Sequence, residues 1–402
     1  MKKIWIVAPF TSIEENNLRN RFVYLANLLS EKGFKITLFT SSFSHFKKRQ
    51  INQNQVHFDN FKILFINEPG YSTNVSFQRI FSHWRFTKNF KEIVRELDPP
   101  DLIYAAYPTM SAAYESEKYA KKNSIPIIID VQDTWPESIS AAFDTDKLFI
   151  RALMWPITKF ANHIYKNADG VIGVSETYVK RTMVENSKSQ FYKPIYIGSD
   201  LSKFDSVSMN YSFKKKENEV FMVYIGTLSH SYDIATAILG INEIEIENLE
   251  IKLYILGDGP DKENLQQLAK KLGVNNSKVF FKGYLDYDEM VSLLKNSDIA
   301  LNAIKGQAKQ TITNKLGDYL SAGLPILNSC RQKEIIDLVD SKNIGVNYIP
   351  GNVESLKKAL KEILANKQQL IEYGMNSRNL AEERFDRKSS YKDILHVIKE
   401  LI

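Results

Sequence analysis

The sequence predicts an α/β protein built of two doubly wound domains that face each other across a cleft. Three observations support this prediction. The chain has 402 residues, which is more than a single core usually serves. Short apolar runs alternate with amphipathic helical segments, as in a parallel sheet that is covered on both faces. The alternation stops once, at the polar segment 206–219, and then starts again.

The first domain is expected over residues 1–205. Its strands are short apolar runs at Ile4–Pro9, Ile36–Ser41, Ile63–Asn67, Leu102–Tyr107, Pro126–Val131, Gly170–Val174 and Pro194–Ile197. Its helices include amphipathic segments at Asn17–Lys32, Phe81–Leu97 and Met110–Asn123. The first of these helices ends at Gly33, because glycine favours the end of a helix.

The second domain is expected over residues 220–375, after a linker at 206–219. Its strands are Val220–Ile225, Ile251–Leu256, Val279–Phe281, Ile299–Ile304, Leu324–Asn328 and Ile344–Tyr348. Its helices are expected at Asp233–Ile246, Lys262–Leu272, Tyr287–Asn296 and Asn314–Ala322. The last segment, 376–402, reads as helical and is expected to cross back onto the first domain. Because doubly wound sheets bind ligands at the carboxyl ends of their strands, the site is expected in the cleft.

Composition indicates a folded soluble protein, with 44% hydrophobic and 25% charged residues. The single cysteine, Cys330, excludes an internal disulfide framework and favours a reducing cytosol. The apolar run 4–10 is too short for a signal peptide and reads as a first strand. No stretch approaches the roughly 18–20 apolar residues of a membrane span. We therefore expect a cytoplasmic protein that can associate peripherally with the inner face of the cell membrane.

The net charge of +6 belongs entirely to the first half of the chain. Residues 1–205 carry 27 Lys and Arg against 21 Asp and Glu, whereas the remaining residues carry 26 of each kind. Such an excess suits an anionic partner, such as a membrane surface or a pyrophosphate-bearing acceptor. A solvated surface without any partner explains it equally well. Nucleic acid is not expected as a partner.

Residues 310–325, QTITNKLGDYLSAGLP, are the most informative stretch of the chain. A polar turn leads into a short helix, which ends near Gly323 before Pro325 opens a strand. The free N–H groups and the positive end of such a helix suit a diphosphate. Asp318, one turn further in, is placed to accept from ribose hydroxyls. An ordinary helix-to-strand unit is the alternative. The candidate diphosphate ligands are Thr311, Thr313, Asn314 and Lys315.

Three further strand ends supply donor-binding candidates. Gly226 and Thr227 follow the first strand of the second domain, Gly257 follows the next, and Tyr284 follows the third. Glycine at a strand end allows the backbone to approach a ligand closely. Plain strand-to-helix turns explain the same glycines. The neighbouring pair 280–281 is better explained by core packing.

A second distinctive run, Asp-Val-Gln-Asp-Thr-Trp-Pro-Glu-Ser at 130–138, follows the most apolar strand of the chain. Asp133 could orient or deprotonate an acceptor hydroxyl, Trp135 could stack on a sugar, and Glu137 lies beside them. The alternative places Trp135 in the core and uses Glu137 as a helix cap.

The first strand-to-helix turn offers Thr11 and Ser12 as weaker acceptor-side candidates. Arg21, in the helix that follows, reads as a solvated charge. The histidines are scattered, and no set of His, Cys and Asp has metal-ligand spacing. We therefore expect no metal site. Three of the histidines are read as ordinary surface or packing residues: His57, His83 and His163.

Residues 147–166, KLFIRALMWPITKFANHIYK, form an amphipathic helix with aromatic and basic side chains. This combination suits binding to a membrane surface. A helix packed on the core of the first domain is an equal alternative. Pro156 would kink the helix.

With these motifs in order, the chain resembles the family-4 retaining glycosyltransferases of GT-B architecture. In that family two glutamates separated by seven residues precede a Gly-x-Pro sequence. Aligning on 323–325 puts Asp318 at the second glutamate and Gln310 at the first. Lys315 then supplies the positive charge for the diphosphate. This spacing and the Trp-Pro-Glu run look like a subgroup that serves bacterial surface polysaccharides.

The resemblance implies a hexosyl- or N-acetylhexosaminyltransferase that uses a nucleotide-diphosphate sugar, with UDP as the nucleotide. It implies a polyprenyl-diphosphate-linked glycan as acceptor, in capsule, O-antigen or exopolysaccharide synthesis. Asp133 and Gln310 are the catalytic candidates, and no cofactor is implied. Two alternatives remain open: a nucleotide-sugar epimerase of the same architecture, and a non-catalytic nucleotide-sugar-binding subunit. The second is favoured by the missing charge at Gln310.

Overall fold

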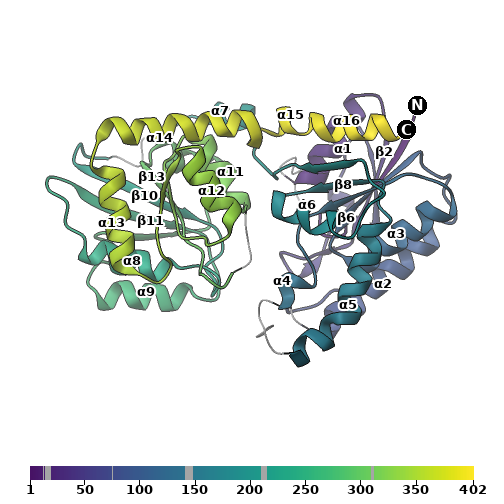
Figure 1. Cartoon of the computed structure of the whole chain (residues 1–402), viewed down its shortest axis with the longest axis horizontal. Helices are drawn as coiled ribbons and strands as arrows, with labels where there is room; N and C mark the ends of the chain where they lie inside the picture. Colours follow the sequence, from purple (N-terminus) through teal and green to yellow (C-terminus); the bar gives the residue numbers. More distant parts are fainter. Residues whose placement is uncertain (12, 14–19, 75, 141–147, 210–214, 309–311) are drawn as a thin grey trace. The chain divides into compact units, whose positions relative to one another are not determined.

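The structure is a computed structural model of the chain, and it describes residues 1–11, 13, 20–74, 76–140, 148–209, 215–308 and 312–402. These residues form two compact units (Figure 1). The first unit comprises Met1–Tyr196 and Tyr391–Ile402, and the second comprises Ile197–Ser390. Each unit contains one parallel sheet with helices on both faces. The predicted class, a pair of parallel-sheet α/β domains, is confirmed.

The described part of the first unit contains a seven-stranded sheet with the order β5-β2-β1-β6-β7-β8-β9. Its strands are β1 (Lys3–Val7), β2 (Lys35–Ser41), β5 (Lys62–Ile66), β6 (Leu102–Tyr107), β7 (Ile127–Val131), β8 (Gly170–Gly173) and β9 (Phe191–Pro194). A small hairpin of β3 (Phe43–Ser44) and β4 (Arg49–Gln50) follows β2, and the short turn η1 (Gln53–Gln55) follows the hairpin. The helices are α1 (Arg21–Glu31), α2 (Phe77–Ile93), α3 (Met110–Lys122), α4 (Glu137–Ser140), α5 (Leu148–Lys166), α6 (Glu176–Met183) and α16 (Lys392–Leu401).

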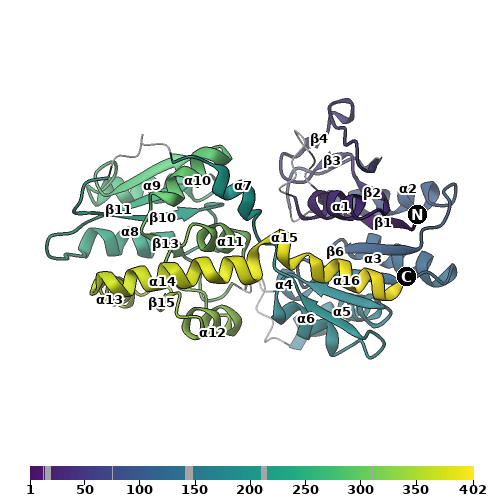
Figure 2. The same ribbon diagram turned by 90° about the horizontal axis from the view of Figure 1, so that it is seen from above.

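The last helix of the chain, α16, belongs to the core of the first unit. Its residues Ile394, Val397 and Ile398 are fully buried in one cluster with side chains of α1 and of the central strands. The Tyr391 ring contacts the Tyr24 ring edge-on, with centroids 5.4 Å apart, which is a favourable arrangement for two aromatic rings. The two helices therefore cover one face of the first sheet (Figures 1 and 2).

Arg21 lies in this core, so the prediction of a solvated charge is wrong. Its side chain is 3% exposed, and its Nε lies 2.7 Å from Oδ2 of Asp130, which is fully buried. Tyr104 donates to the same carboxylate over 2.7 Å. The carbonyl oxygens of 195 and 196 accept from the guanidinium. The helical period of α1 could not reveal this role, because the partner comes from a strand more than a hundred residues away.

We expect Arg21→Met to lower the free energy of unfolding by about 3–5 kcal/mol, because it leaves the carboxylate of Asp130 buried without its cation. Urea unfolding followed by circular dichroism measures this change. The double variant Arg21→Met with Asp130→Leu should recover much of the loss, since it removes both charges. A single variant within about 1 kcal/mol of the wild type would contradict a buried ion pair.

The described part of the second unit contains a six-stranded sheet with the order β12-β11-β10-β13-β14-β15. Its strands are β10 (Glu219–Ile225), β11 (Glu250–Leu256), β12 (Val279–Gly283), β13 (Ile299–Asn302), β14 (Ile326–Asn328) and β15 (Gly345–Asn347). Its helical segments are α7 (Leu201–Ser206), α8 (Ile234–Glu243), α9 (Lys262–Lys271), α10 (Tyr287–Lys295), α11 (Asn314–Ser321), α12 (Lys333–Ser341), α13 (Val353–Leu364), α14 (Lys367–Leu380), η2 (Ala381–Phe385) and α15 (Arg387–Ser390).

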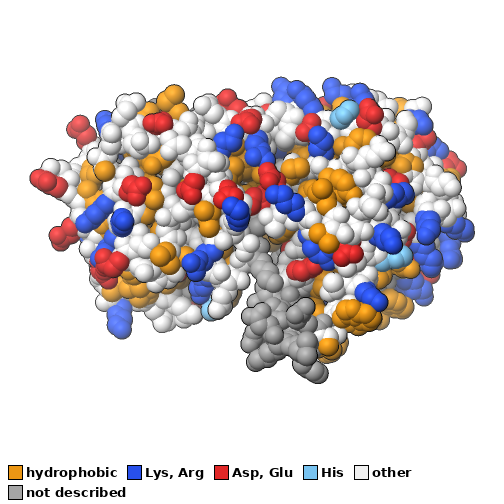
Figure 3. Space-filling view, viewed as in Figure 1, with side chains coloured by type: hydrophobic (Ala, Val, Ile, Leu, Met, Phe, Trp, Pro, Cys, Tyr) orange, Lys and Arg blue, Asp and Glu red, His pale blue; other side chains and the backbone are white. Residues whose placement is uncertain are grey.

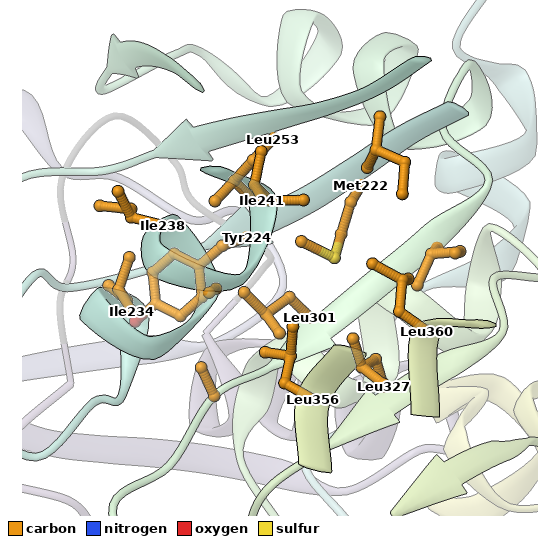
Figure 4. Close-up of a cluster of buried hydrophobic side chains, with 14 of the residues drawn as sticks. Met222, Tyr224, Ile234, Ile238, Ile241, Leu253, Leu301, Leu327, Leu356 and Leu360 are labelled. Atoms are coloured by element: carbon orange, nitrogen blue, oxygen red, sulfur yellow. The ribbon is translucent and has the colours of Figure 1, made fainter. Parts of the chain in front are cut away.

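The core of this unit lies between the sheet and the helices α8 and α13 (Figure 4). Strand residues such as Met222 and Leu253 meet Ile238 and Leu360 there, and all four are fully buried. Burying each such side chain is worth about 1.5–3 kcal/mol. The chain enters the second unit at Ile197, ahead of the polar segment 206–219 that the sequence favoured as a linker. The α7 segment already pairs with α14 within this unit, through two 2.8 Å contacts between Asp205 and Arg378.

Candidate functional site

The strand order creates a switch point in the second sheet, between β10 and β13. The connections that leave these two strands run to opposite sides, which opens a crevice at their carboxyl ends. Gly226 follows β10 directly, and α11 begins beyond β13 with Asn314. The donor candidates of these two segments therefore meet at one place in the second unit.

Tyr319 of α11 fixes the helix to this switch point. Its hydroxyl accepts from the N–H of Ile225 over 2.9 Å and donates to the carbonyl of Leu301 over 3.2 Å. Strands β10 and β13 pair only at 222–299 and 223–300, so they have already separated where they reach Ile225 and Leu301. The fully buried phenol thus bridges the strands where their own hydrogen bonding ends.

Replacement of Tyr319 by phenylalanine should lower the free energy of unfolding by about 1–3 kcal/mol, since a buried donor and acceptor lose their shared partner. Chemical denaturation measures the change. Tyr284→Phe is the matched control, because Tyr284 is 80% exposed and its loss of a hydroxyl should leave stability unchanged. Equal stability of the two variants would show that the bridge is unimportant.

Lys315 is the unusual charge of this site. Its side chain is 8% exposed, and its Nζ donates to the Tyr224 hydroxyl over 3.1 Å. The same Nζ lies 4.2 Å and 3.8 Å from the ring centroids of Tyr224 and Tyr232. Among the described residues, no carboxylate forms an ion pair with it. Burial lowers the pKa of Lys315 to about 7. Without a ligand, the Lys315 side chain therefore loses its proton readily near neutral pH.

Two glycines bring backbone close to this ammonium. Gly226 has a φ of 123°, and a Cβ there would lie 3.4 Å from the Nζ of Lys315. Gly257 has a φ of 126°, and a Cβ there would lie 2.0 Å from the carbonyl oxygen of Gly226. Side chains at these positions would collide with the chain or block access to Lys315. The glycines therefore keep the end of β10 and the following turn open.

The remaining donor candidates lie near the same end of the sheet. Thr313 precedes α11, and its Oγ1 is buried without a hydrogen-bond partner among the described residues. Asn314 is exposed at the first position of α11. Asp318 accepts from the Ser199 hydroxyl over 2.6 Å. The carbonyl of Thr227 accepts from Tyr224 over 2.8 Å.

Other candidates are placed differently or lie outside the described residues. Tyr284 is exposed beyond β12. Gln310 and Thr311 in the second unit, and Ser12 in the first, lie outside the described residues. The hydroxyl of Thr11 is buried and donates to the carbonyl of Ala8 over 2.7 Å, so its proton is already used inside the first unit.

In the first unit, the Asp133–Glu137 run follows β7 and gathers aromatic and charged groups. The indole Nε1 of Trp135 donates to Oδ2 of Asp133 over 3.0 Å, and the hydroxyl of Ser138 donates to Oδ1. Burial raises the pKa of Asp133, although these two hydrogen bonds oppose the effect. Glu137 begins α4 and accepts from Nε of Arg181. The run therefore holds a half-buried carboxylate beside a half-buried indole.

Residues that no sequence motif marks complete this cluster. The guanidinium of Arg79 lies 4.8 Å from the Trp135 ring and 5.6 Å from the rings of Phe10 and Tyr71. Its Nε is buried without a partner among the described residues. Burial, and then the charge of Arg79, lowers the pKa of His83 to about 3. Arg79 and His83 lie on α2 and carry no motif, so only the fold reveals that Arg79 packs against Trp135 and that His83 packs against Phe10.

A second histidine of the cluster is also held neutral. His45 lies 4.7 Å from the Phe10 ring, and its Nδ1 contacts the Tyr71 hydroxyl. Burial, followed by the charges of Lys48 and Arg79, lowers the pKa of His45 to about 4. The cluster therefore combines two basic side chains, Arg79 and Lys48, with aromatic rings and with two imidazoles that are uncharged near neutral pH.

His, Cys, Asp and Glu side chains in the described ranges form no group of three that could hold a metal ion. Among the helices that the structure describes, none combines the length and apolar character needed to cross a bilayer.

Comparison with known proteins identifies the class. The family model for Glycosyltransferase Family 4 matches residues 19–189, and that for Glycosyl transferases group 1 matches residues 209–380. Between them the two models cover most of both units. The chain belongs to these glycosyltransferases, and its fold is GT-B. It is therefore an enzyme of the sugar-transferring class.

Two relatives are distant in sequence but align with at least 90% of this chain. The uncharacterized glycosyltransferase MJ1069 of Methanocaldococcus jannaschii is 23% identical over 387 residues, covering 94% of this chain and 93% of the relative. Protein CapJ of Staphylococcus aureus is 23% identical over 386 residues, covering 90% and 92%. Among solved structures, Alr3699/HepE of Anabaena in complex with UDP has a TM-score of 0.73 and 15% identity over the whole of both chains. HepE has also been solved with UDP-glucose.

Proposed function

We propose that this enzyme transfers a sugar from a UDP-linked donor, and that Lys315 binds the diphosphate of the donor at the start of α11. The observation that carries the proposal is the burial of Lys315 without an acidic partner among the described residues. A buried cation is unfavourable unless an anion compensates it. The UDP and UDP-glucose complexes of HepE, which shares the fold, support the choice of nucleotide.

Several groups would hold the donor around this lysine. The N–H groups at the start of α11 and the positive end of its dipole face the crevice at the switch point. A helix end alone stabilises a charge by only about 0.3–1 kcal/mol at an exposed site, so the lysine is needed as well. Gly226 and Gly257 allow the diphosphate to approach the backbone. The Oγ1 of Thr313 supplies a buried hydroxyl, and Asp318 accepts from the ribose.

The proposed transfer retains the configuration of the sugar. The bond between the anomeric carbon and the diphosphate oxygen breaks, and the acceptor oxygen forms the new bond on the same face. The leaving diphosphate takes the proton of the acceptor hydroxyl. Lys315 and the start of α11 stabilise the charge that develops on this leaving group, which is where a fixed positive charge contributes most. Gln310 would place its amide near the transferred sugar.

We further propose that the acceptor is a polyprenyl-diphosphate-linked glycan, in the synthesis of a capsule, O-antigen or exopolysaccharide. The basic excess of the first half of the chain supports an anionic acceptor. In the first unit, Trp135 offers a face on which a sugar ring can stack. Asp133 would orient the acceptor hydroxyl, and Arg79 would attract a phosphate or carboxylate of the acceptor.

A panel of nucleotide sugars tests the donor part of this proposal. UDP-glucose, UDP-galactose, UDP-N-acetylglucosamine, GDP-mannose and ADP-glucose are added in turn, and thermal unfolding is recorded. A ligand at 100 times its Kd should stabilise the protein by about 2.7 kcal/mol. We expect at least one UDP sugar to give a clear shift and the GDP and ADP sugars to give little. Stabilisation by none of the five would refute the proposed donor class.

A further inference from the structure

Large hydrophobic side chains are exposed on α2, and the proposed transfer chemistry does not use them. Four of them are more than half exposed: Phe77 (90%), Ile80 (66%), Phe81 (54%) and Trp84 (53%). Their spacing of three and four residues puts them on one face of the helix. The opposite face carries Phe86 and Phe90, which are buried in the core. The helix α2 is thus apolar on two faces, and the described residues cover only one.

Two other segments of the first unit expose similar side chains. Phe46, in the turn between β3 and β4, is 74% exposed. On α5, Leu153 is 64% exposed and Trp155 is 57% exposed, whereas Tyr165 is fully buried. The amphipathic helix predicted at 147–166 therefore packs on the core towards its C-terminal end and leaves the large side chains of Leu153, Trp155 and Ile157 uncovered. Figure 3 shows hydrophobic side chains gathered along the lower part of α5.

The three segments share one edge of the first sheet. The hairpin that carries Phe46 follows β2, α2 follows β5, and α5 lies beyond β7. Because all these strands are parallel, the chain leaves each of them at the carboxyl edge. The same edge carries Trp135 and Arg79 of the acceptor-side cluster. Exposed apolar groups thus lie at the same edge of the sheet as the place where the acceptor is proposed to bind.

Charge gives these segments a preferred partner. Three stretches of sequence that contain them have no Asp or Glu: 45–58, 69–91 and 148–168. Lysines accompany the exposed indoles: Nζ of Lys88 lies 6.0 Å from the Trp84 ring, and Nζ of Lys159 lies 3.9 Å from the Trp155 ring. Indoles beside lysines, in stretches without acidic residues, are typical of the interface of an anionic bilayer.

We propose that these side chains form a docking surface for an anionic lipid bilayer. We define the docking surface by its exposed residues, which are Phe46, Phe77, Ile80, Phe81, Trp84, Leu153, Trp155 and Ile157. The aromatic and aliphatic groups enter the boundary between headgroups and acyl chains, and the nearby lysines contact the anionic headgroups. This inference rests on the proposed function and deepens it, because it names the surface that brings a lipid-linked acceptor to the enzyme.

Co-sedimentation of the full chain with vesicles tests the docking surface. Vesicles of phosphatidylcholine with phosphatidylglycerol should bind the wild type, and added salt should weaken the binding, because charge screening reduces the lysine contribution. Vesicles of phosphatidylcholine alone should bind it less. The double variant Phe77→Ser with Trp84→Ser should lose roughly tenfold or more in partitioning, since two large apolar side chains no longer enter the bilayer.

The matched control is Ile371→Ser with Met375→Ser, because these α14 residues of the second unit are also large and about half exposed. The control should bind vesicles as the wild type does. A wild type that ignores both vesicles, or a control that loses as much as the α2 variant, overturns the inference. So does a dimer that the α2 variant dissociates while vesicles stay unbound, since the surface would then bind a second copy.

Donor binding, measured on the same preparations, separates this inference from the proposed function. The α2 variant should bind UDP-glucose as the wild type does, which also shows that it is folded. A wild type that binds a UDP sugar but does not bind vesicles would overturn only the docking surface. Intact vesicle binding without binding of any UDP sugar would overturn only the proposed donor.

Discussion

Replacing Lys315 by methionine is expected to stabilise the empty protein and to abolish donor binding. The pKa of Lys315 is lowered to about 7 by burial, against an ordinary value of 10.5. Below pH 7 the folded state therefore carries a charge that is better solvated in the unfolded chain. At pH 7 this difference costs up to about 4 kcal/mol of stability. Methionine has a similar length and removes that cost.

The sign of the pH dependence follows from the lowered pKa. Between pH 7 and 10.5 the unfolded chain binds a proton that the folded protein has released, so the stability of the wild type rises with pH in this window. The methionine variant should lack that contribution. Its advantage over the wild type is greatest at and below pH 7 and disappears near pH 10.5. Urea unfolding of both proteins at several pH values measures the difference.

The same substitution should remove binding of UDP sugars, because no other buried cation of the described site replaces the lysine. Gain of stability together with loss of binding is the signature of a residue kept for function. The control is Lys282→Met, since Lys282 is an exposed lysine of the same unit. It should change neither quantity. A Lys315→Met protein that binds UDP-glucose as tightly as the wild type would contradict the assigned role.

Asp318→Asn is expected to weaken donor binding by roughly 10- to 100-fold, because a hydrogen bond to a charged acceptor contributes about 1.5–3 kcal/mol. Asparagine keeps the size of the side chain and removes the charge that the ribose hydroxyls would meet. Titration calorimetry with UDP-glucose measures the change in Kd.

Ser199→Ala is the matched control for this variant. The Ser199 hydroxyl donates to Asp318 over 2.6 Å, so its removal leaves the carboxylate in place and should change the Kd less than Asp318→Asn does. If Asp318 served only to hold Ser199, both variants would lose stability to a similar extent and neither would lose affinity. That result would remove Asp318 from the donor site.

The parallel sheets could be predicted because their strands are continuous apolar runs. The strand Leu102–Tyr107 has the predicted bounds, and α3 begins at the predicted Met110. The predicted bounds are wrong where a helix cap or a neighbouring element determines where a helix begins or ends. Helix α2 begins at Phe77, because Ser76 caps it by accepting from the N–H of Arg79. The apolar period alone indicated a later start at Phe81, since the first turn of α2 has an uncovered apolar face.

The positions of Gly226, Gly257 and the α11 segment could be predicted from sequence because tight turns and helix starts need particular residues at strand ends. The crowding at Gly226 and Gly257 agrees with that reasoning. The acceptor-side cluster could not be found in this way. Tyr71 and Arg79 come from the connection that follows β5, and His45 comes from the hairpin that follows β2. Their meeting with each other, and that of Arg79 with Trp135, depends on strand order. The buried pair of Arg21 and Asp130 was missed for the same reason.

Calorimetry of UDP-glucose binding at pH 8, in two buffers of different ionisation enthalpy, tests whether Lys315 binds the diphosphate of the donor. The diphosphate of this ligand has no proton to exchange at that pH, whereas Lys315 is largely neutral in the free protein and must be charged in the complex. We expect the wild type to take up nearly one proton when it binds UDP-glucose, and its affinity for UDP-glucose to fall as the pH rises above 7. Binding without proton uptake, or no binding of UDP-glucose or any other UDP sugar, would contradict this role of Lys315.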